Sequence, residues 1–432
     1  MNLLYANDRS GQFPPSYYAA TAIAAREFAP LRGEARADVC VIGAGYTGLS
    51  AALHLAQAGV SVVVVDAHRV GFGASGRNGG QVGSGQRQDQ GWLEDRFGIE
   101  RARCLWDMAQ DAKALVKSLI TQHNIPTPFA HGVAHAARTP ASLADQSSYA
   151  EKLARDYGYT EIDVLKRDDF AAIVPSSAYV GGAIDRGAGH IHPLNFCIGL
   201  GNAAADAGAQ IFGQSPVHHI DKGARSVVQT DKGRVICDTV ILATNGYGAG
   251  LMRQTSARVM PINNFIVATQ PLGGEAARVL TQNIAVADDR FVVNYWRLSD
   301  DGRLLFGGGE SYGYRFPDII PTVMKPMLQV YPHLRGVRID YAWGGTLAIT
   351  PSRMPYAARL GPVLTASGYS GHGVALATMA GKLMAQAAQG QSDGFDLLSE
   401  VAPPAFPGLG GLRWPLLVGA MTWYSVRDRL GW

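Results

Sequence analysis

The sequence predicts an α/β protein in which a doubly wound, Rossmann-like domain, discontinuous in the chain, carries an inserted α+β domain built on a mainly antiparallel sheet. A strand, glycine turn, helix and strand follow one another from residue 38, and a further strand, glycine turn and helix follow Pro362. Between them, residues 260–310 contain short β-rich runs separated by turns, which favours antiparallel strands. Because the nucleotide-binding pattern stands at both ends of the chain, we expect the second domain to be threaded into the first.

Length and composition agree with a large folded protein. The 432 residues suffice for two or three domains, with 47% hydrophobic and only 17% charged residues. The 52 glycines fall in clusters rather than in a period of three, which indicates backbone brought close to a ligand and excludes collagen. The net charge of +3 comes without a basic block, so nucleic acid is not an expected partner.

The chain divides by pattern into four parts. Residues 1–36 form a polar leader, and residues 37–90, 188–250 and 346–390 form the nucleotide-binding domain. Residues 91–187 and 251–345 form the inserted substrate domain, and residues 391–432 a C-terminal segment with an apolar helix that packs on the protein's own surface. We expect no stable membrane insertion, because the sequence contains no run of about 18 consecutive apolar residues. Four scattered cysteines and no secretory pattern predict buried free thiols and a cytoplasmic location.

The first element is a βαβ unit. VCVIGAG predicts a buried parallel strand, YTGLSAALHLAQAG has helical spacing, and VSVVVVDA predicts a second strand that ends at Asp66. Gly43, Gly45 and Gly48 form G-x-G-x-x-G between the first strand and the helix, where pyrophosphate approaches the backbone at the helix N-terminus. Asp66, 23 residues after Gly43, is positioned to accept hydrogen bonds from ribose hydroxyls. The unit predicts a bound dinucleotide.

Two further glycine clusters favour FAD over NAD. The loop GASGRNGGQ, residues 73–81, implies a longer ligand in close backbone contact, with Ser75, Arg77 and Asn78 as donors. The segment GYSGHGVALATMAGK, residues 368–382, places Gly371, His372 and Gly373 at a helix start, where amides and helix dipole favour negative charge such as that of a reduced flavin. We expect His372 to add a proton donor.

Together these segments resemble the D-amino acid oxidase-like (DAO) superfamily of FAD-dependent amine oxidases over nearly the whole chain. Within it, PSYYAAT, GFGASGRNGGQ, DRGAGHIHPLNF, RLLFGGGESYG and WYSVRDRLGW look like the bacterial gamma-glutamylputrescine oxidase subgroup. The resemblance implies FAD contacts along the first glycine turn, the acidic strand end, the second loop, an adenine-side strand, the strand under the pyrophosphate and the third loop. These are Gly43, Gly45, Tyr46, Thr47, Gly48, Asp66, Ala67, Gly73, Ala74, Ser75, Arg77, Asn78, Gly79, Gly80, Gln81, Val217, Ala243, Thr244, Gly345, Gly371, His372, Gly373 and Val374.

Two departures from relatives bear on the cofactor. Sarcosine oxidase-type relatives attach flavin to a cysteine, whereas Gly345 stands near that place and Ser352 replaces their aspartate. We therefore expect FAD to be non-covalent. Some relatives have a lysine over the flavin that activates oxygen, and residues 291–315 contain none, so rapid reaction with oxygen does not follow from the sequence.

Flavin amine oxidation needs a positioned carbon rather than a strong base, so the expected catalytic and substrate residues are orienting groups. Trp343 is a candidate pocket wall, and Arg297, which shares a strand face with Tyr295, can hold a substrate carboxylate; a surface salt bridge is the alternative. Glu310 is a candidate for attracting a substrate ammonium. His190 and His192 are expected to cap a helix rather than do chemistry.

The expected function is oxidation of the terminal primary amine of a gamma-glutamylated polyamine, with oxygen as the second substrate and aldehyde, ammonia and hydrogen peroxide as products. One alternative is an amino acid or sarcosine-type oxidase, or a dehydrogenase that passes electrons to a quinone. Another is a flavin-binding subunit without turnover. The sequence leaves the amine, the oligomeric state and the rate with oxygen open.

Overall fold

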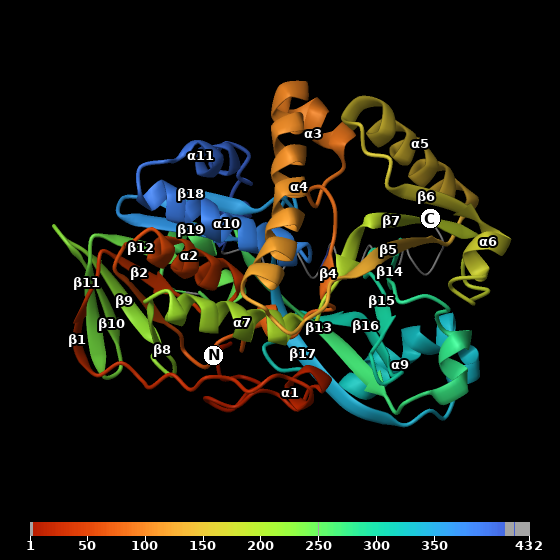
Figure 1. Cartoon of the computed structure of the whole chain (residues 1–432), viewed down its shortest axis with the longest axis horizontal. Coiled ribbons are helices and arrows are strands. Elements are labelled where there is room, and N and C mark those ends of the chain that lie inside the picture. Colours follow the sequence, from red (N-terminus) through yellow and green to blue (C-terminus); the bar gives the residue numbers. More distant parts are fainter. Residues whose placement is uncertain (1–2, 249, 411–418, 420–432) are drawn as a thin grey trace.

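The computed structural model describes residues 3–248, 250–410 and 419, and it places a helix-covered parallel sheet beside a larger, mainly antiparallel sheet (Figure 1). This confirms the α/β fold class expected from the sequence. The smaller body contains α2, α7 and α10, and the larger sheet carries α9 near one end and α5 and α6 near the other.

The parallel sheet has the strand order β18-β19-β12-β2-β3-β8. Its strands are β2 (Val39–Ile42), β3 (Val62–Val65), β8 (Gln210–Phe212), β12 (Thr239–Leu242), β18 (Tyr356–Leu360) and β19 (Val363–Ser367). Every neighbouring pair is parallel except β18 and β19. All six strands come from the three ranges assigned to the nucleotide-binding domain, so its discontinuity follows from the strand order.

Alternate residues of β2 and β3 enter two different cores. Val39, Val41, Val62 and Val64 pack against α2 (Tyr46–Gln57), α7 (Pro193–Asp206) and α10 (Gly373–Ala388). Their neighbours pack against a four-stranded sheet of β1 (Gly33–Arg36), β9 (Val217–Lys222), β10 (Ser226–Thr230) and β11 (Gly233–Cys237). Successive side chains of a strand point to opposite faces, so burial on both faces accounts for the continuous valine runs.

The nine-stranded sheet has the order β17-β13-β16-β15-β14-β5-β7-β4, with β6 paired to β7. Its strands are β4 (Gln81–Val82), β5 (Ala130–Ala137), β6 (Ile162–Lys166), β7 (Gly181–His190), β13 (Met260–Thr269), β14 (Ala285–Asp288), β15 (Tyr295–Leu298), β16 (Leu304–Ser311) and β17 (Ile339–Ile349). Only β14 and β5 are parallel neighbours, which confirms the mainly antiparallel expectation. β4 joins this sheet from within the expected nucleotide-binding range, and the exact domain boundaries remain a prediction.

Helices surround the larger sheet. α3 (Gln90–Phe97) and α4 (Ile99–Gln122) lie between β4 and β5 in the chain, α5 (Pro140–Tyr157) lies between β5 and β6, and α6 (Arg167–Ala171) follows β6. α9 (Ile319–Val330) packs its apolar side on β13 and β16 in a core that contains Trp296 and Phe306. α8 (Arg253–Ser256) and α11 (Asp393–Glu400) are two further helices of the described residues. The expected apolar helix of the tail lies outside the described residues.

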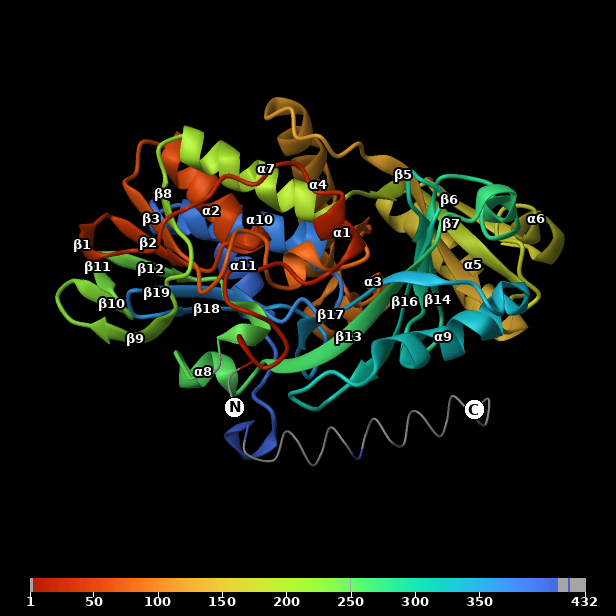
Figure 2. The ribbon, with the colours of Figure 1, turned by 90° about the horizontal axis from the view of Figure 1, so that it is seen from below.

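The leader runs from β1 to α1 (Tyr17–Ala20) along the lower edge of Figure 1 and is seen from another side in Figure 2. It contacts both bodies: the Asp8 carboxylate forms an ion pair with Arg77 at 3.0 Å, and the Tyr17 hydroxyl donates to Asp301 at 2.9 Å. The amide nitrogen of Asn7 also donates to the Tyr314 carbonyl at 2.8 Å. The leader is therefore part of the packed molecule.

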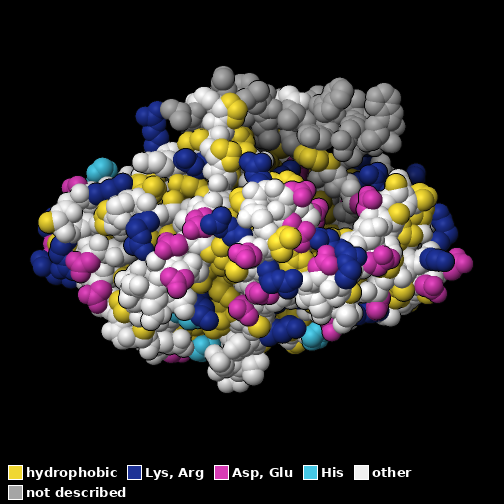
Figure 3. Space-filling view, turned by 90° about the horizontal axis from the view of Figure 1, so that it is seen from above, with side chains coloured by type: hydrophobic (Ala, Val, Ile, Leu, Met, Phe, Trp, Pro, Cys, Tyr) yellow, Lys and Arg dark blue, Asp and Glu magenta, His cyan; other side chains and the backbone are white. Residues whose placement is uncertain are grey.

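The surface carries charges of both signs, and three of the four cysteines are buried. Basic and acidic side chains are interspersed on the face drawn in Figure 3. Cys40, Cys197 and Cys237 are buried and free as expected, whereas Cys104 is free but exposed on α4, because it faces away from the apolar side of that helix. Among the described helices, none combines the length and apolarity that crossing a membrane requires.

Candidate functional site

The first glycine turn leaves no room for side chains. Gly43 has φ +107°, and a Cβ there would lie 2.7 Å from the Ala243 carbonyl oxygen. A Cβ on Gly48 would lie 1.8 Å from the Gly43 oxygen, and one on Gly45 would lie 2.7 Å from Ser75 Oγ. The helix start of α2 is thereby held against the ends of β2 and β12, with its first amides directed toward the loop that carries Ser75. This is the arrangement that pyrophosphate binding requires.

Asp66 lies at the end of β3 and holds two backbone segments. Its carboxylate oxygens accept hydrogen bonds from the backbone N–H groups of Ala44 and His68, each at 2.7 Å. Burial raises the pKa of Asp66, and the two N–H donors oppose that rise. The backbone N–H of Ser215 donates to the Asp66 carbonyl at 2.7 Å, which brings the segment before β9, and with it Val217, beside this strand end.

The second loop is shaped by its own polar groups. The Asn78 amide donates to the carbonyls of Ala74 and Ser75 at 3.1 and 2.9 Å, and its oxygen accepts from Gly80 N–H at 2.7 Å. Ser75 Oγ accepts from the backbone N–H of Tyr46 at 3.1 Å, at the N-terminus of α2. Ser75 thus lies at the expected pyrophosphate position, whereas the Asn78 amide stabilises the loop itself.

Arg77 is buried in the same loop and ties three parts of the chain together. Its Nη1 donates to Asp8 and to the Gly344 carbonyl at 3.1 Å, and its Nε donates to the Phe72 carbonyl at 2.7 Å. Its Nη2 is buried and has no hydrogen-bond partner among the described residues. A buried guanidinium nitrogen left without an acceptor fits a missing polar group at this place.

The third loop joins the first helix and the second loop. The hydroxyls of Tyr369 and Thr47 are hydrogen-bonded at 2.8 Å. His372 Nε2 lies 3.2 Å from the Gly85 carbonyl, and burial with the nearby charge of Arg87 lowers the pKa of His372 to about 4. The imidazole is neutral at pH 7, and its hydrogen lies on Nε2 because a carbonyl can only accept. Nδ1 is then an acceptor, which corrects the expectation that His372 supplies a proton donor to the flavin.

The residues present fit FAD. The glycine cradle, the free lone pairs of Asp66 and the helix start of α10 after Gly371 match the needs of a dinucleotide and a flavin ring. Thr244 Oγ1, at the end of β12 beside this cradle, is buried and without a partner among the described residues, as is Arg77 Nη2. Both are donors that an extended phosphate- and oxygen-rich ligand can satisfy. Of the other expected contacts, the Gln81 amide on β4 donates to the Val286 carbonyl of β14 at 3.0 Å, within the larger sheet.

Trp343 and Gly345 lie on the face of β17 turned toward the second loop. The Trp343 indole N–H donates to the Arg77 carbonyl at 3.0 Å, and a Cβ on Gly345 would lie 3.2 Å from Arg77 Cβ. Trp343 is 1% exposed and packs with Tyr18 and Ile266 in a core between the leader, α7 and the sheet. Its expected role as a pocket wall is therefore corrected: it is a core side chain that positions the Arg77 loop.

Arg297 shares a face of β15 with Tyr295, as expected, while Trp296 enters the opposite core. Its guanidinium is 7% exposed and donates to the carbonyls of Gly79 and Leu298 at 3.3 and 3.2 Å and to the Tyr18 hydroxyl at 3.4 Å. These contacts fix the second loop to the sheet. The Arg297 side chain is enclosed and bonded to neutral acceptors. It is therefore neither an anchor for a substrate carboxylate nor part of a surface salt bridge.

Glu310 remains available to a ligand. It lies opposite Asn264 in the β13–β16 ladder, on the face that Gly345 shares across β13. The Tyr312 hydroxyl donates to its carboxylate at 2.9 Å. Burial raises the pKa of Glu310, whereas Tyr312 and the positive charge of Arg353 lower it.

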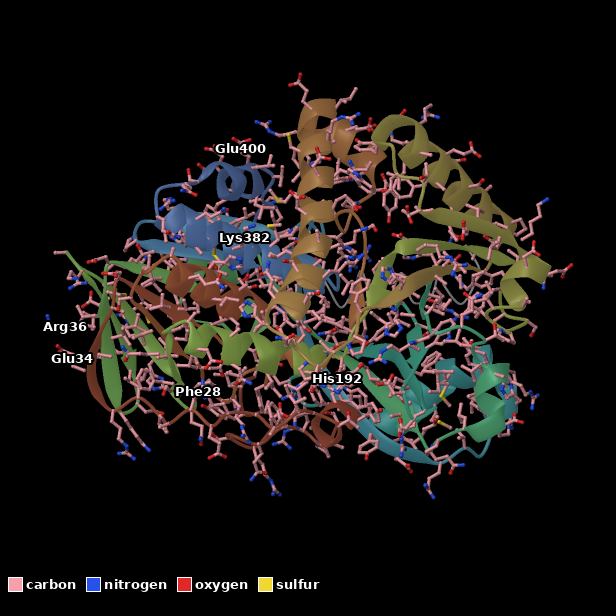
Figure 4. The ribbon with its side chains drawn as sticks, in the orientation of Figure 1. Phe28, Glu34, Arg36, His192, Lys382 and Glu400 are labelled. Atoms are coloured by element: carbon pink, nitrogen blue, oxygen red, sulfur yellow. The ribbon has the colours of Figure 1, made fainter. Side chains whose placement is uncertain are left out.

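His192 caps a helix as expected, whereas His190 lies at the end of strand β7 rather than at a helix start. His192 Nδ1 accepts from the backbone N–H of Asn195 at 3.1 Å and caps α7, where that helix meets the larger sheet (Figure 4). His190 is 4% exposed within β7, and burial with the nearby Arg297 charge lowers its pKa to about 3. Both are neutral at pH 7.

Sequence reasoning missed Asp8, Arg87 and Arg353. Asp8 is one acid in a polar leader, and only the folded chain brings it to Arg77. Arg87 follows the second glycine cluster directly in GSGQRQD, so its place in the sequence was the one available signal. Arg353 follows β17 in a turn, where a single arginine has no pattern.

The fold and the glycine cradle define a dinucleotide-binding oxidoreductase architecture, and the comparisons identify the family. The model of the DAO family of FAD-dependent oxidoreductases matches residues 38–387. The chain is 42% identical to the "Probable oxidoreductase OrdL" of Rhizobium meliloti (strain 1021) over 96% of this chain and 97% of the relative. It is 38% identical to the "Gamma-glutamylputrescine oxidoreductase" of Escherichia coli (strain K12) over 96% and 98%. The solved glycine oxidase from Geobacillus kaustophilus superposes with a TM-score of 0.73 at 20% identity, covering 86% of this chain and 100% of that chain.

The chain belongs to the DAO family and is an FAD-dependent oxidoreductase. This confirms the resemblance drawn from the three glycine clusters and the expectation of FAD. The structural similarity to glycine oxidase agrees with the same fold.

Proposed function

We propose that this oxidoreductase acts on an amine, and specifically on the terminal primary amine of a gamma-glutamylated polyamine such as gamma-glutamylputrescine. The observation that carries the proposal is the similarity, over nearly the full length of both chains, to the Escherichia coli gamma-glutamylputrescine oxidoreductase. With oxygen and water consumed, one amine gives one aldehyde, one ammonia and one hydrogen peroxide.

Bound FAD supplies the two-electron chemistry, by accepting a hydride from the carbon that bears the amine. The chain's own residues hold and orient. Gly43, Gly45 and Gly48 admit the pyrophosphate, and Asp66 accepts from the ribose hydroxyls. Arg77 and Arg297 fix the second loop from opposite sides, through Gly344 and Gly79. Gly345 stands where relatives carry a tethering cysteine, which supports non-covalent FAD.

The substrate approaches from the face of the larger sheet that Tyr295 and Glu310 share. The Tyr295 hydroxyl donates to Asn264 at 2.5 Å, and the Tyr295 ring lies 2.9 Å from where a Cβ on Gly79 would be. Tyr295 thus touches the second flavin loop directly. Because Asn264 pairs with Glu310 and Gly345 in register, these groups lie side by side on one face of the larger sheet.

A quinone-linked amine dehydrogenase is the second candidate, since residues 291–315 offer no lysine for oxygen activation. One assay series tests both proposals. Anaerobic addition of gamma-glutamylputrescine is expected to bleach the flavin, and peroxide release in air is expected to accompany turnover. Bleaching without peroxide would assign the dehydrogenase, and an unbleached flavin with every glutamylated or free amine in the panel would refute both.

A further inference from the structure

Three loops meet beside His372, and two of them carry an arginine. The Gln88 amide donates to the Ser352 carbonyl at 2.9 Å, which joins residues 83–88 to the turn after β17. Arg87 Nε donates to the Ser370 carbonyl at 3.1 Å, which joins the same segment to the third glycine loop. Arg87 is therefore held against the third glycine loop, beside the turn that carries Arg353.

Arg87 and Arg353 are two cations without a carboxylate partner among the described residues. The Arg353 guanidinium lies over the Phe291 ring, 5.4 Å from its centroid. The hydrogen bond from Arg87 to the third loop uses Nε and leaves the two terminal nitrogens outside that contact. Burial and the charge of Arg353 together lower the pKa of Arg87, as two like charges held near each other do. An anion between them would remove this repulsion.

The backbone conformation at Arg353 indicates that the arginine side chain has a function. Its φ is +63°, in the left-handed region that long side chains disfavour. The turn is held by the Arg353 N–H to the Thr350 carbonyl at 3.1 Å and by the Thr350 hydroxyl to the Met354 carbonyl at 2.6 Å. Glycine would fit this conformation without strain, so an arginine here indicates a use for its guanidinium.

Glu310 and Arg353 are linked through one apolar cluster: Phe291, which lies under the Arg353 guanidinium, and Tyr312, whose hydroxyl donates to Glu310, pack against the same core. The charge of Arg353 lowers the pKa of Glu310, and the charge of Glu310 raises the pKa of Tyr295, the residue that contacts the second loop. Arg87, Arg353 and Glu310 thus lie on segments that contact one another.

We propose that Arg87 and Arg353 form a carboxylate subsite and Glu310 an ammonium subsite, which together hold the α-amino acid head of the substrate. This inference rests on the proposed function, because a gamma-glutamyl group carries that zwitterionic head far from the reacting amine. Guanidinium groups bind carboxylates through paired hydrogen bonds, and a half-buried carboxylate balances the ammonium. The pair replaces Arg297, which is enclosed, as the anchor.

Three ligands and FAD-loaded variants test the subsite by calorimetry, without turnover. Gamma-glutamylbutylamide carries the head and no terminal amine, N-butylglutaramic acid keeps only the carboxylate, and N-butylbutanamide keeps neither. Arg353→Gly removes one cation and fits the left-handed backbone conformation at that position. Arg87→Gln removes the second cation, and Arg353→Lys retains the positive charge. Arg335→Gln is the control, since Arg335 is exposed on the larger body.

Arg353→Gly and Arg87→Gln are each expected to weaken gamma-glutamylbutylamide binding by about tenfold to a hundredfold, the range of a charge-assisted contact. Arg353→Lys should recover part of the loss, and Arg335→Gln should show none. Glu310→Gln should weaken the binding of gamma-glutamylbutylamide but not the binding of N-butylglutaramic acid.

Unchanged affinities in both arginine variants would overturn the subsite, and so would equal parental affinity for all three ligands. Turnover of gamma-glutamylputrescine by the parent is scored separately. A parent that oxidises it, with variants that bind as the parent does, keeps the function and rejects the subsite. A parent that oxidises no glutamylated amine, with variants that lose affinity, rejects the function and keeps a subsite for α-amino acids.

Discussion

The Asp66 carboxylate accepts a hydrogen bond from the backbone N–H of Ala44 at 2.7 Å. This contact joins the end of β3 to the glycine turn between β2 and α2, so the acidic residue shapes the loop beside the ribose position. Each carboxylate oxygen uses one lone pair on the backbone and keeps another for a ribose hydroxyl.

Asp66→Ala is expected to weaken FAD binding by about 1–3 kcal/mol, because charged hydrogen bonds to the ribose are lost and the turn is loosened. The dissociation constant of FAD, measured by flavin fluorescence on the refilled apoprotein, checks this. Asp221→Ala, on the exposed edge of β9, is the control. An Asp66→Ala protein with the parent's FAD affinity would show the ribose assignment to be wrong.

Gly48→Ala is expected to destabilise the protein by at least about 2 kcal/mol and to lower its FAD content, since the new Cβ meets the Gly43 oxygen at 1.8 Å and the turn must open. Gly274→Ala is the matched control, because a Cβ there meets nothing within 4 Å. Urea unfolding and the ratio of flavin to protein absorbance measure both effects. Equal behaviour of the two variants would contradict the close packing of α2 on β2.

Asp8→Asn is expected to cost about 3–5 kcal/mol, because it leaves the buried Arg77 guanidinium without its counter-charge. The side chains of this pair are 2% and 7% exposed. The pair Arg26–Asp206 is 52% and 68% exposed, so Asp206→Asn should cost less than about 1 kcal/mol. Urea midpoints and tryptic cleavage of the leader are the readouts, and a similar cost for both variants would refute the anchoring role of Asp8.

Stability is expected to fall with acid between about pH 6 and pH 4, in part through His190. Its pKa is about 3 in the folded chain against about 6.5 when unfolded. As the pH falls, the unfolded state is protonated first and is stabilised relative to the folded state. The contribution is about 1.4 kcal/mol per pH unit. His190→Gln should flatten the unfolding free energy against pH, whereas His219→Gln, exposed on β9, should not. Identical slopes would mean that His190 is not buried neutral.

FAD is expected to leave the protein on acid precipitation, since Gly345 provides no thiol for a covalent bond. The supernatant should hold the flavin and the pellet should be colourless. Yellow colour that stays with the washed pellet would show a covalent link through another residue.

The parallel sheet, its helices and the family could be predicted because each depends on local patterns. The valine runs of β2 and β3, the glycines before α2 and Asp66 at a strand end lie within 30 residues of one another. The substrate side could not be predicted in the same way. Arg297 and Trp343 had the right residue types, yet burial by the leader decided their roles. Arg87 and Arg353 are 266 residues apart, and their segments are joined by the hydrogen bond from Gln88 to Ser352.

One nitrogen of Arg77 binds residue 8, near the start of the chain, and residue 344, four-fifths of the way along its 432 residues. During synthesis, residue 8 is made 336 residues before residue 344, so this junction cannot form until the chain has passed that point. The nascent protein therefore carries an unfinished cofactor loop while the residues between them are being made. That loop closes only when the strands on both sides of Arg77 exist together.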